Sequence, residues 1–192
     1  MLAPMPSGSD TGATAKRRPG PTTAARAYLE AIDAHDLDAA AALWRPGSID
    51  RIVGMAEFTV PDGMREWFGT LFAAFPDFRI EVLSITAQKR NAAARYRVTG
   101  TFDGTAKFEG LTPNGAAVDI EGFDLFTVED GLIVDNRGYL NGADLARQLG
   151  ALPPAGSIAE RGMTAALNAR TAAGELVGSI RERAGTARSP RA

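Results

Sequence analysis

The chain of 192 residues contains no cysteine, and this absence removes several kinds of chemistry at once. Without a thiol there can be no disulfide framework, no cysteine nucleophile and no cysteine-ligated zinc or iron–sulfur centre. The single histidine, His35, falls in the turn expected between the first two helices, where we expect a surface or capping role. No glycine-rich phosphate loop, nucleophile elbow or cluster of metal ligands is present, so we expect neither a cofactor nor a metal.

A concentrated basic charge and long apolar runs are also missing. The net charge is −2, which argues against binding to a phosphate backbone and makes nucleic acid an unexpected partner. No run approaches the roughly 18 to 20 apolar residues that a membrane span needs, and no apolar secretory signal is seen at the N-terminus. We therefore expect a cytoplasmic protein that does not insert in a membrane.

The composition is that of one globular domain, because 45% of the residues are hydrophobic and 23% are charged. Residues 1–21, rich in Pro, Gly, Ser and Thr, are expected to form a disordered tail. Residues 22–152 are expected to form the domain, and Pro153-Pro154 marks a break. Residues 153–192 are expected to form a helical extension with a frayed end, whose helix either docks on the domain or a partner subunit or is loosely attached.

The hydrophobic period changes along the domain from helical spacing to alternation. The expected order is a helix capped by Thr22, a helix over Asp36–Trp44, a strand over Ile49–Val60, a helix over Met64–Phe75, strands over Phe78–Ala87, Ala93–Phe102, Asp119–Val128 and Leu132–Leu140, and a short helix within 141–152. Glu129-Asp130-Gly131 is a hairpin turn signal. Helices followed by a mostly antiparallel sheet predict an α+β domain with its helices packed on one face of a curved sheet.

One carboxylate interrupts an apolar face of this sheet. In the predicted strand around residues 118–128, alternation places Asp124 on the same face as Val118, Ile120, Phe126 and Val128. A buried aspartate is costly unless it is paired, hydrogen-bonded or protonated, and such carboxylates are frequent at functional sites. Asp124 is therefore the first candidate for a functional residue, against the alternative of a structural carboxylate bonded to Tyr28, Arg97 or a backbone amide.

Several strings resemble the SnoaL-like polyketide cyclases and ester cyclases of the nuclear transport factor 2-like (NTF2-like) superfamily. They are Tyr28-Leu29-Glu30-Ala31-Ile32-Asp33-Ala34-His35-Asp36-Leu37-Asp38, Leu71-Phe72-Ala73-Ala74-Phe75-Pro76-Asp77-Phe78, Thr99-Gly100-Thr101, residues 122–133 and the closing Leu145-Ala146-Arg147-Gln148-Leu149-Gly150. The resemblance covers about residues 22–150. It implies a cone-shaped domain with a conical pocket, to which the C-terminal helix is appended.

The resemblance also implies roles for two residues. Asp124 matches the acid/base aspartate of the cyclases, and Tyr28 matches the helix-1 tyrosine of the ketosteroid isomerase oxyanion hole. That oxyanion hole also contains an aspartic acid, which is a well-known example of a carboxylic acid kept neutral by an apolar site. Helical spacing independently places Tyr28 on an apolar stripe with Ala25 and Ile32. We therefore expect Asp124 and Tyr28 to act as catalytic groups in one cavity.

Other residues are expected to bind the substrate, which the resemblance implies to be a small apolar carbonyl compound. They are Trp67, Phe68, Phe126, Tyr139 and Asn141, the last two orienting the ligand from the end of the final strand. Arg95 and Arg97 alternate onto the opposite face from Tyr96 and are expected to lie on a solvated or dimer-facing surface. The resemblance also implies a homodimer formed through the outer face of the sheet.

The chain departs from the family pattern at three places. It lacks the histidine that usually supports the aspartate, Asn141 replaces an acid at the end of the last strand, and the only carboxylate near the isomerase base position is Asp50, whose register the sequence leaves open. The expected function is cofactor-independent polyketide-type cyclisation or isomerisation. A non-catalytic ligand-binding or dimerisation module is the alternative, and an epoxide hydrolase or dehydratase is a third.

Overall fold

The computed structural model describes residues 18–186 of the chain, with side chains to residue 175. Its elements are α1 (Pro21–Asp33), α2 (Leu37–Ala42), β1 (Trp44–Ile52), β2 (Ala56–Thr59), α3 (Asp62–Ala74), β3 (Arg79–Gln88), β4 (Asn91–Phe102), β5 (Ala116–Glu129), β6 (Leu132–Leu140), α4 (Gly142–Gln148) and α5 (Ile158–Thr186). No helix in this range is long and apolar enough to cross a membrane. Most of the tail expected at 1–21 lies outside the described residues.

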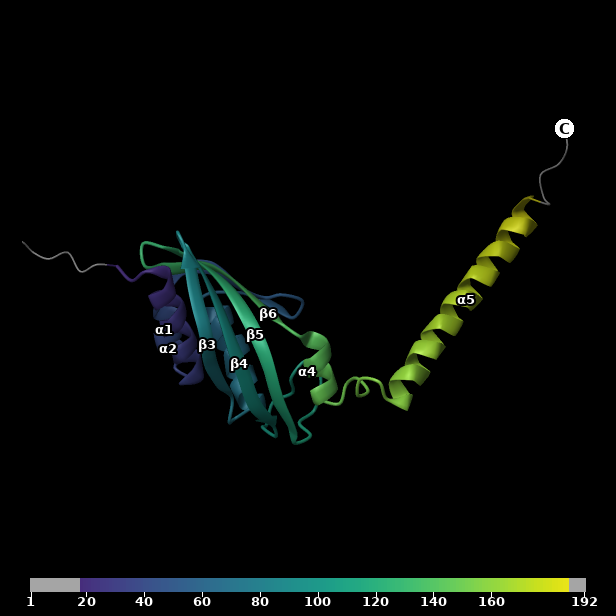
Figure 1. The fold of residues 1–192 in the computed structure, drawn as a ribbon, viewed down its shortest axis with the longest axis horizontal. Coiled ribbons are helices and arrows are strands. Elements are labelled where there is room, and N and C mark those ends of the chain that lie inside the picture. Colours follow the sequence, from purple (N-terminus) through teal and green to yellow (C-terminus); the bar gives the residue numbers. More distant parts are fainter. Residues whose placement is uncertain (1–17, 187–192) are drawn as a thin grey trace, which may run out of the picture.

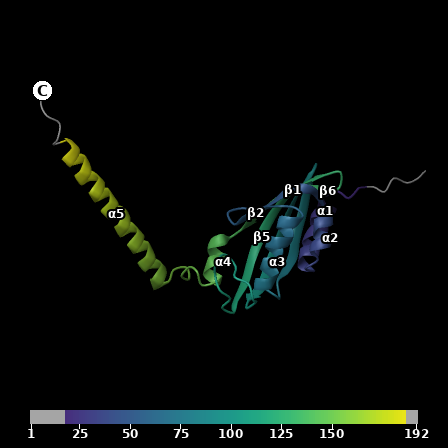
Figure 2. The same ribbon diagram turned by 180° about the vertical axis from the view of Figure 1, so that it is seen from behind.

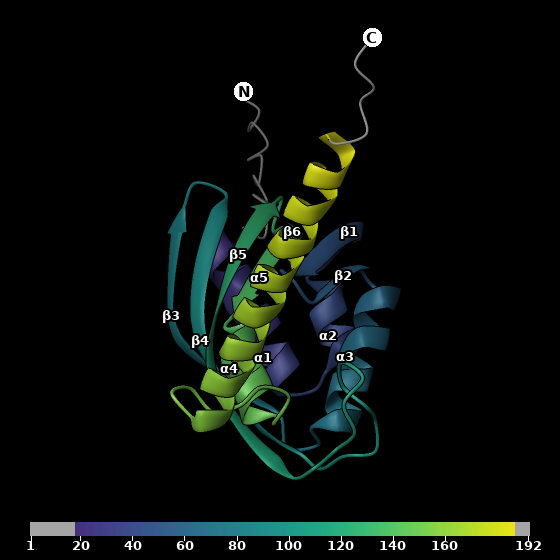
Figure 3. The same cartoon turned by 90° about the vertical axis from the view of Figure 1, so that its right-hand side faces the viewer.

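The six strands form one curved sheet in the order β2-β1-β6-β5-β4-β3. β1 and β6 run parallel, and every other neighbouring pair is antiparallel. Helices α1, α2 and α3 lie together on one side of the sheet. This is the far side in Figure 1 and the near side in Figure 2, where all three helices are labelled, and Figure 3 shows the layers from the side. The predicted α+β class, with helices on one face of a curved, mostly antiparallel sheet, is confirmed.

The first two helices differ from the sequence-based expectation: α1 lacks the predicted threonine cap, and α2 is shorter than predicted. Pro21, which has no N–H to leave unpaired, opens α1 after Gly20, and no described side chain caps the helix, so Thr22 is not its cap. Asp36 caps α2 by accepting a hydrogen bond from the Ala39 amide at 2.9 Å. α2 ends at Ala42, because Trp44 is already paired with Ile133 of β6.

The expected single strand over 49–60 is a hairpin. β1 runs into a turn at Gly54, whose φ of 81° lies in the region that glycine tolerates, and β2 returns antiparallel to it. β1 also starts earlier than predicted and carries an irregularity between Trp44 and Ile49. This irregularity breaks the regular alternation of inward and outward residues along β1.

The last two helices differ in how they contact the domain. α4 packs Leu145 into the open end of the helix–sheet layer beside β5. α5, by contrast, extends away from the domain (Figure 1), and its side chains over residues 161–175 are exposed. Its first turn is held by an ion pair between Arg147 and Glu160 at 2.8 Å. Leu176, Val177 and Ile180 of the predicted apolar stripe lie outside the described side chains.

Candidate functional site

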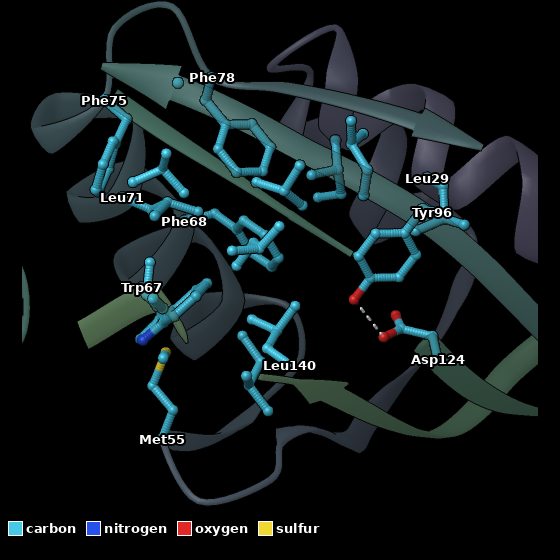
Figure 4. A pocket seen from close by; sticks show the side chains of 18 of the residues that line it. Leu29, Met55, Trp67, Phe68, Leu71, Phe75, Phe78, Tyr96, Asp124 and Leu140 are labelled. Atoms are coloured by element: carbon cyan, nitrogen blue, oxygen red, sulfur yellow. Dashed lines mark hydrogen bonds between the residues drawn. The ribbon is translucent and has the colours of Figure 1, made fainter. Parts of the chain in front are cut away.

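A cavity of about 90 Å³ opens between the inner face of the sheet and the helices. Its lining is mostly aliphatic and aromatic, and Figure 4 shows Trp67, Phe68, Phe75 and Phe78 at one end, away from Asp124 and Tyr96. Ligand pockets usually measure roughly 300–1,000 Å³. A polycyclic ligand would therefore require flexible lining side chains such as Met55 to move.

Five polar side chains form a continuous hydrogen-bonded chain at the inner end of this cavity. Tyr28 Oη donates to Asp50 Oδ2 at 2.7 Å, and Tyr96 Oη donates to Asp124 Oδ1 at 2.8 Å. Asn136 Nδ2 donates to Asp50 Oδ1 and to Asp124 Oδ2, each at 3.0 Å. All five residues are buried and all five line the cavity. The order Tyr28–Asp50–Asn136–Asp124–Tyr96 therefore joins two carboxyl groups through one amide.

Strand register brings these residues together. Asp124 of β5 lies opposite Gly138 of β6, and Asn136, two residues earlier on the same face, lies opposite Asp50 of β1. Residues two apart on a strand share a face, so the three polar side chains meet on the inner side of neighbouring strands. Tyr28 reaches the same point from the buried stripe of α1.

Two glycines make room for this arrangement. A Cβ on Gly122 would lie 2.6 Å from Tyr96 Cζ, so the tyrosine ring lies across the bare backbone of its cross-strand partner. A Cβ on Gly138 would lie 2.7 Å from Asp124 Oδ1. Since both distances are far below van der Waals contact, these glycines are required for the observed positions of Tyr96 and Asp124.

Among the described residues, no cation lies beside the two carboxyl groups. Burial raises the pKa of Asp124 to about 7, with the nearby Asp50 charge adding to the rise and the Tyr96 and Asn136 hydrogen bonds opposing it. Burial likewise raises the pKa of Asp50 to about 6 against the hydrogen bonds from Tyr28 and Asn136. Burial also raises the pKa of both tyrosines, which therefore remain hydrogen-bond donors. The site can thus hold or release a proton near neutral pH.

The predicted catalytic pair is brought into one cavity but is not directly bonded. Asp124 and Tyr28 both line the cavity. The hydroxyl of Tyr28, however, is engaged by Asp50, and the tyrosine bonded to Asp124 is Tyr96. Arg97, the other partner considered for Asp124, lies on the opposite face of the sheet, where it pairs with Asp119.

The predicted substrate-binding residues divide into two groups. Trp67 and Phe68 line the cavity from α3. Phe126 is fully buried but packs edge-on against Tyr28, with ring centroids 5.7 Å apart, and does not line the cavity. Tyr139 is 45% exposed on the outer face, since it alternates with Gly138 and Leu140, and Asn141 caps α4 by accepting from the Asp144 amide. The structure therefore places Phe126, Tyr139 and Asn141 outside the cavity.

Sequence reasoning did not select Asp50, Tyr96 or Asn136 as site residues. A signal existed for two of them. Alternation backward from Leu140 through Gly138 reaches Asn136, and the paired Arg95 and Arg97 imply that Tyr96 faces inward. For Asp50 the sequence offered only its place near the isomerase base position, because the irregular start of β1 hides which face its residues occupy. His35, in turn, stacks on Phe72 and hydrogen-bonds with the Phe78 carbonyl at 3.0 Å, away from this network.

No group of three or more histidine or acidic side chains is arranged to hold a metal ion within the described part of the chain. The polar network itself contains two carboxyls, one amide and two hydroxyls. Its chemistry is that of proton exchange and hydrogen bonding within an apolar enclosure.

A helix-covered curved sheet with buried acids in its cavity defines the protein as an NTF2-like pocket domain. A family model described as SnoaL-like polyketide cyclase matches residues 22–149, and the chain belongs to this family. No curated protein matches significantly.

Solved structures share the same architecture. AclR of Streptomyces galilaeus, described as a candidate hydroxylase, is 28% identical with a TM-score of 0.59, over 68% of this chain and 95% of that one. IdmH of Streptomyces antibioticus, a candidate polyketide cyclase, is 23% identical with a TM-score of 0.58, over 68% and 98%. An LEH-like epoxide hydrolase of M. tuberculosis is 19% identical with a TM-score of 0.51, over 68% and 89%. At these identities the last two support the fold alone.

Proposed function

We propose that this protein is a cofactor-independent acid–base enzyme that cyclises or isomerises an apolar, polyketide-like carbonyl compound. The observation that carries the proposal is Asp124, a buried carboxyl in an otherwise apolar cavity, with no cation beside it in the described part of the chain. A carboxyl whose pKa is raised to about 7 can give up or accept a proton at neutral pH, which is the requirement for general acid–base catalysis.

In this mechanism Asp124 exchanges a proton with the carbonyl or enol oxygen of the substrate. Tyr96 holds the carboxyl in place through its hydrogen bond at 2.8 Å. Tyr28, expected to donate directly to the substrate oxyanion, would have to leave Asp50 to do so, and we propose that it supports Asp50 instead. The aromatic groups Trp67 and Phe68 would pack against the apolar rings of the ligand.

The test is turnover of a panel of polycyclic β-keto esters by the full chain, with products separated by chromatography and identified by mass. We expect Asp124→Asn to reduce the rate by about 10²-fold or more, because general acid–base catalysis contributes about 10²–10⁴-fold. The matched control is Asp119→Asn, which removes a carboxylate from the outer face of the same strand. An undiminished rate in Asp124→Asn would exclude Asp124 from the mechanism.

Epoxide hydrolysis is the second candidate function, and the observation that favours it is the pair of bridged carboxyls. Two acids held through one amide could protonate an epoxide oxygen and deprotonate a water molecule. Structural neighbours include the LEH-like epoxide hydrolase and an epoxide hydrolase/cyclase-like enzyme, SalBIII, at 22% identity and a TM-score of 0.52. Incorporation of oxygen-18 from labelled water into the product would distinguish hydrolysis from cyclisation, since cyclisation by carbon–carbon bond formation adds no water.

We also propose that the outer face of the sheet forms a homodimer. Leu83, Phe123, Leu125 and Tyr139 are each about two-fifths exposed there, and Phe123 and Tyr139 are directly paired across β5 and β6. Exposed apolar patches of this kind often mark protein interfaces. Light scattering should report a dimer for the full chain and a monomer for Phe123→Lys, and a monomeric parent protein would contradict the proposal.

A further inference from the structure

We propose that Asn136 joins Asp50 and Asp124 into a single acid–base unit, in which Asp124 is the acid, Asp50 is the catalytic base and Asn136 is the positioning residue. This inference rests on the proposed function, because it assigns the second reacting group of the same site. Asp50 lies near the position of the isomerase base, and what is new is its coupling to Asp124 through Asn136.

The hydrogen bonds around the two carboxyls are nearly symmetrical. Each carboxyl accepts a tyrosine hydroxyl on one oxygen and Asn136 Nδ2 on the other. Since both carboxyl oxygens bond the same nitrogen, they are at most two hydrogen-bond lengths apart. Two buried carboxyls this close do not both ionise independently, because each negative charge raises the pKa of the other.

Among the described residues, no cationic side chain lies beside the pair to screen one carboxyl group from the other. The titratable side chains facing the pair are Tyr28 from α1 and Tyr96 from β4, both of which remain neutral donors. α3 and α4 contribute only apolar side chains to the cavity lining. Asp135, adjacent to Asn136 on the outer face, raises the pKa of Asp50 further but is itself paired with Arg51. Since the pKa is about 6 for Asp50 and about 7 for Asp124, the pair holds one proton between about pH 6 and pH 7.

One retained proton suits a reaction that needs an acid and a base at the same time. In an aldol closure, Asp50 removes a proton from the carbon next to one carbonyl, and the enolate carbon forms a bond to a second carbonyl carbon. The π electrons of that second carbonyl move to its oxygen, which takes the proton from Asp124. The pair gains one proton and loses one, so it still holds one at the end and needs no oxidant or cofactor.

Asn136 fits the positioning role because of its contacts and its burial. Its side chain is 2% exposed, and its Nδ2 is the only hydrogen-bonding link between the two acids among the described residues. Its Oδ1 has no hydrogen-bond partner within the described part of the chain. A buried amide that leaves its oxygen unpaired in order to bridge two carboxyls is costly, which argues against a purely structural role.

The first experiment needs no substrate. The carboxyl carbons of aspartate in the full chain are labelled with carbon-13, and the resonances of Asp50 and Asp124 are followed against pH. We expect Asp50→Asn to move the titration of Asp124 to lower pH, because a neighbouring negative charge is lost. Asp119→Asn on the outer face should leave both resonances unchanged. An Asp124 titration that Asp50→Asn does not move would overturn the coupling.

Removing the bridge should have the opposite effect. Asn136→Leu takes a hydrogen bond from both ionised carboxyls, so both titrations should move to higher pH. If this variant does not fold, Asn136→Ser is the second choice, and Asp50→Asn alone still decides the question of coupling. Unchanged titrations in a folded Asn136 variant would remove the positioning role from this residue.

The second experiment measures turnover of the same β-keto esters against pH. We expect Asp50→Asn to slow turnover by about tenfold to 10²-fold and to remove the acidic limb of the rate profile. The double variant Asp50→Asn/Asp124→Asn should be no slower than the slower single variant, because residues that act as a unit are not additive. Full activity and an unchanged profile in Asp50→Asn, together with loss in Asp124→Asn, would refute the base while the proposed function survives. Full activity in Asp124→Asn would refute the proposed function instead.

Discussion

The two faces of strand β5 carry the same type of residue in opposite chemical states. On the outer face Asp119 is paired with Arg97, whose hydrogen bonds lower the pKa of Asp119. On the inner face Asp124 is bonded to a tyrosine and an amide, and burial raises its pKa to about 7. The surroundings of each face, rather than the residue type, decide whether an aspartate is a surface ion or a proton carrier.

The neighbouring strands repeat this division. Arg95 of β4 forms a bidentate pair with Glu121 of β5 on the outer face, with both bonds at 2.9 Å. On the inner face the next residue of β4, Tyr96, supplies a neutral donor. An arginine on the inner face would stabilise the ionised form of Asp124 and lower its pKa. The placement of the β4 arginines on the outer face is therefore what makes the inner site suitable for acid–base chemistry.

The largest expected difference between the faces is in the pH dependence of stability. The folded pKa of Asp124 is above its unfolded value of about 3.9, so the contribution of Asp124 to the free energy of unfolding is largest at acid pH and falls as pH rises from about 4 to 7. Asp124→Asn should remove this fall and be more stable than the parent protein at pH 8 by roughly 2–4 kcal/mol. Urea unfolding at pH 4, 6 and 8 measures it.

Asp119→Asn is the control for this prediction, because the contribution of Asp119 to the unfolding free energy depends on pH with the opposite sign. The folded pKa of Asp119 is lowered, so its contribution is present above the ordinary aspartate pKa and is lost as pH falls through the folded value. Parallel pH curves for the parent protein and Asp124→Asn would show that Asp124 is not perturbed on folding.

The next prediction concerns the close contact between Gly122 and the Tyr96 ring on the inner face. Gly122→Ala should force the Tyr96 ring away from its position, since a Cβ would lie 2.6 Å from Cζ, and should destabilise the protein by about 1–3 kcal/mol. We also expect turnover to fall, because Tyr96 would lose its bond to Asp124. Thermal unfolding and turnover measure the two effects. Gly69→Ala, on the exposed side of α3 with nothing within 4 Å, is the control and should not lower stability.

A smaller effect comes from the Tyr96 hydroxyl alone. Tyr96→Phe keeps the ring and removes the hydrogen bond that lowers the pKa of Asp124, so that pKa should rise. Unfolding free energy should change by only about 1 kcal/mol. The rate profile should move to higher pH, whereas Tyr139→Phe on the outer face should leave it in place. A profile that is identical in Tyr96→Phe and the parent protein would argue against Tyr96 as a partner of Asp124.

The smallest effect is expected from the outer ion pairs. Arg95 and Glu121 are each more than half exposed, and exposed pairs contribute about 0–1 kcal/mol. Arg95→Gln should therefore leave turnover unchanged and lower the unfolding free energy by less than about 1 kcal/mol, an effect that high salt reduces. A double-mutant cycle with Glu121→Gln measures the coupling energy between Arg95 and Glu121. A coupling energy well above about 1 kcal/mol would show that the outer ion pairs contribute more to stability than exposed pairs should.

Alternation was a sufficient guide wherever a strand was regular. In β5 it placed Asp124 inside and Asp119 outside, and in β4 it placed Arg95 and Arg97 outside, in agreement with the structure. It failed at β1, where the irregularity near Ile49 hid the inward position of Asp50. At the end of β6 the resemblance suggested Tyr139 and Asn141 as ligand contacts, although alternation with Gly138 places Tyr139 on the outer face.

The hydrogen-bond partners of Asp124 could not be predicted from the sequence either. Tyr28 lies on the buried stripe of α1 as its spacing indicates, but its hydroxyl bonds Asp50 rather than Asp124. Which of two nearby carboxyls a tyrosine contacts depends on how α1 sits over the sheet, and sequence spacing contains no information about that position. Asn136 became part of the site only through the register between β1 and β6.

By itself the sequence determined the α+β class, the family and the burial of one carboxylate on an apolar strand face, because period and motif are local properties of the chain. Tertiary structure alone decided that a second carboxylate, an amide and a second tyrosine share that cavity. Their meeting depends on strand register, on a strand irregularity and on two glycines that leave room for larger neighbours. These are contacts between segments far apart in sequence, and each is settled by packing and not by local preference.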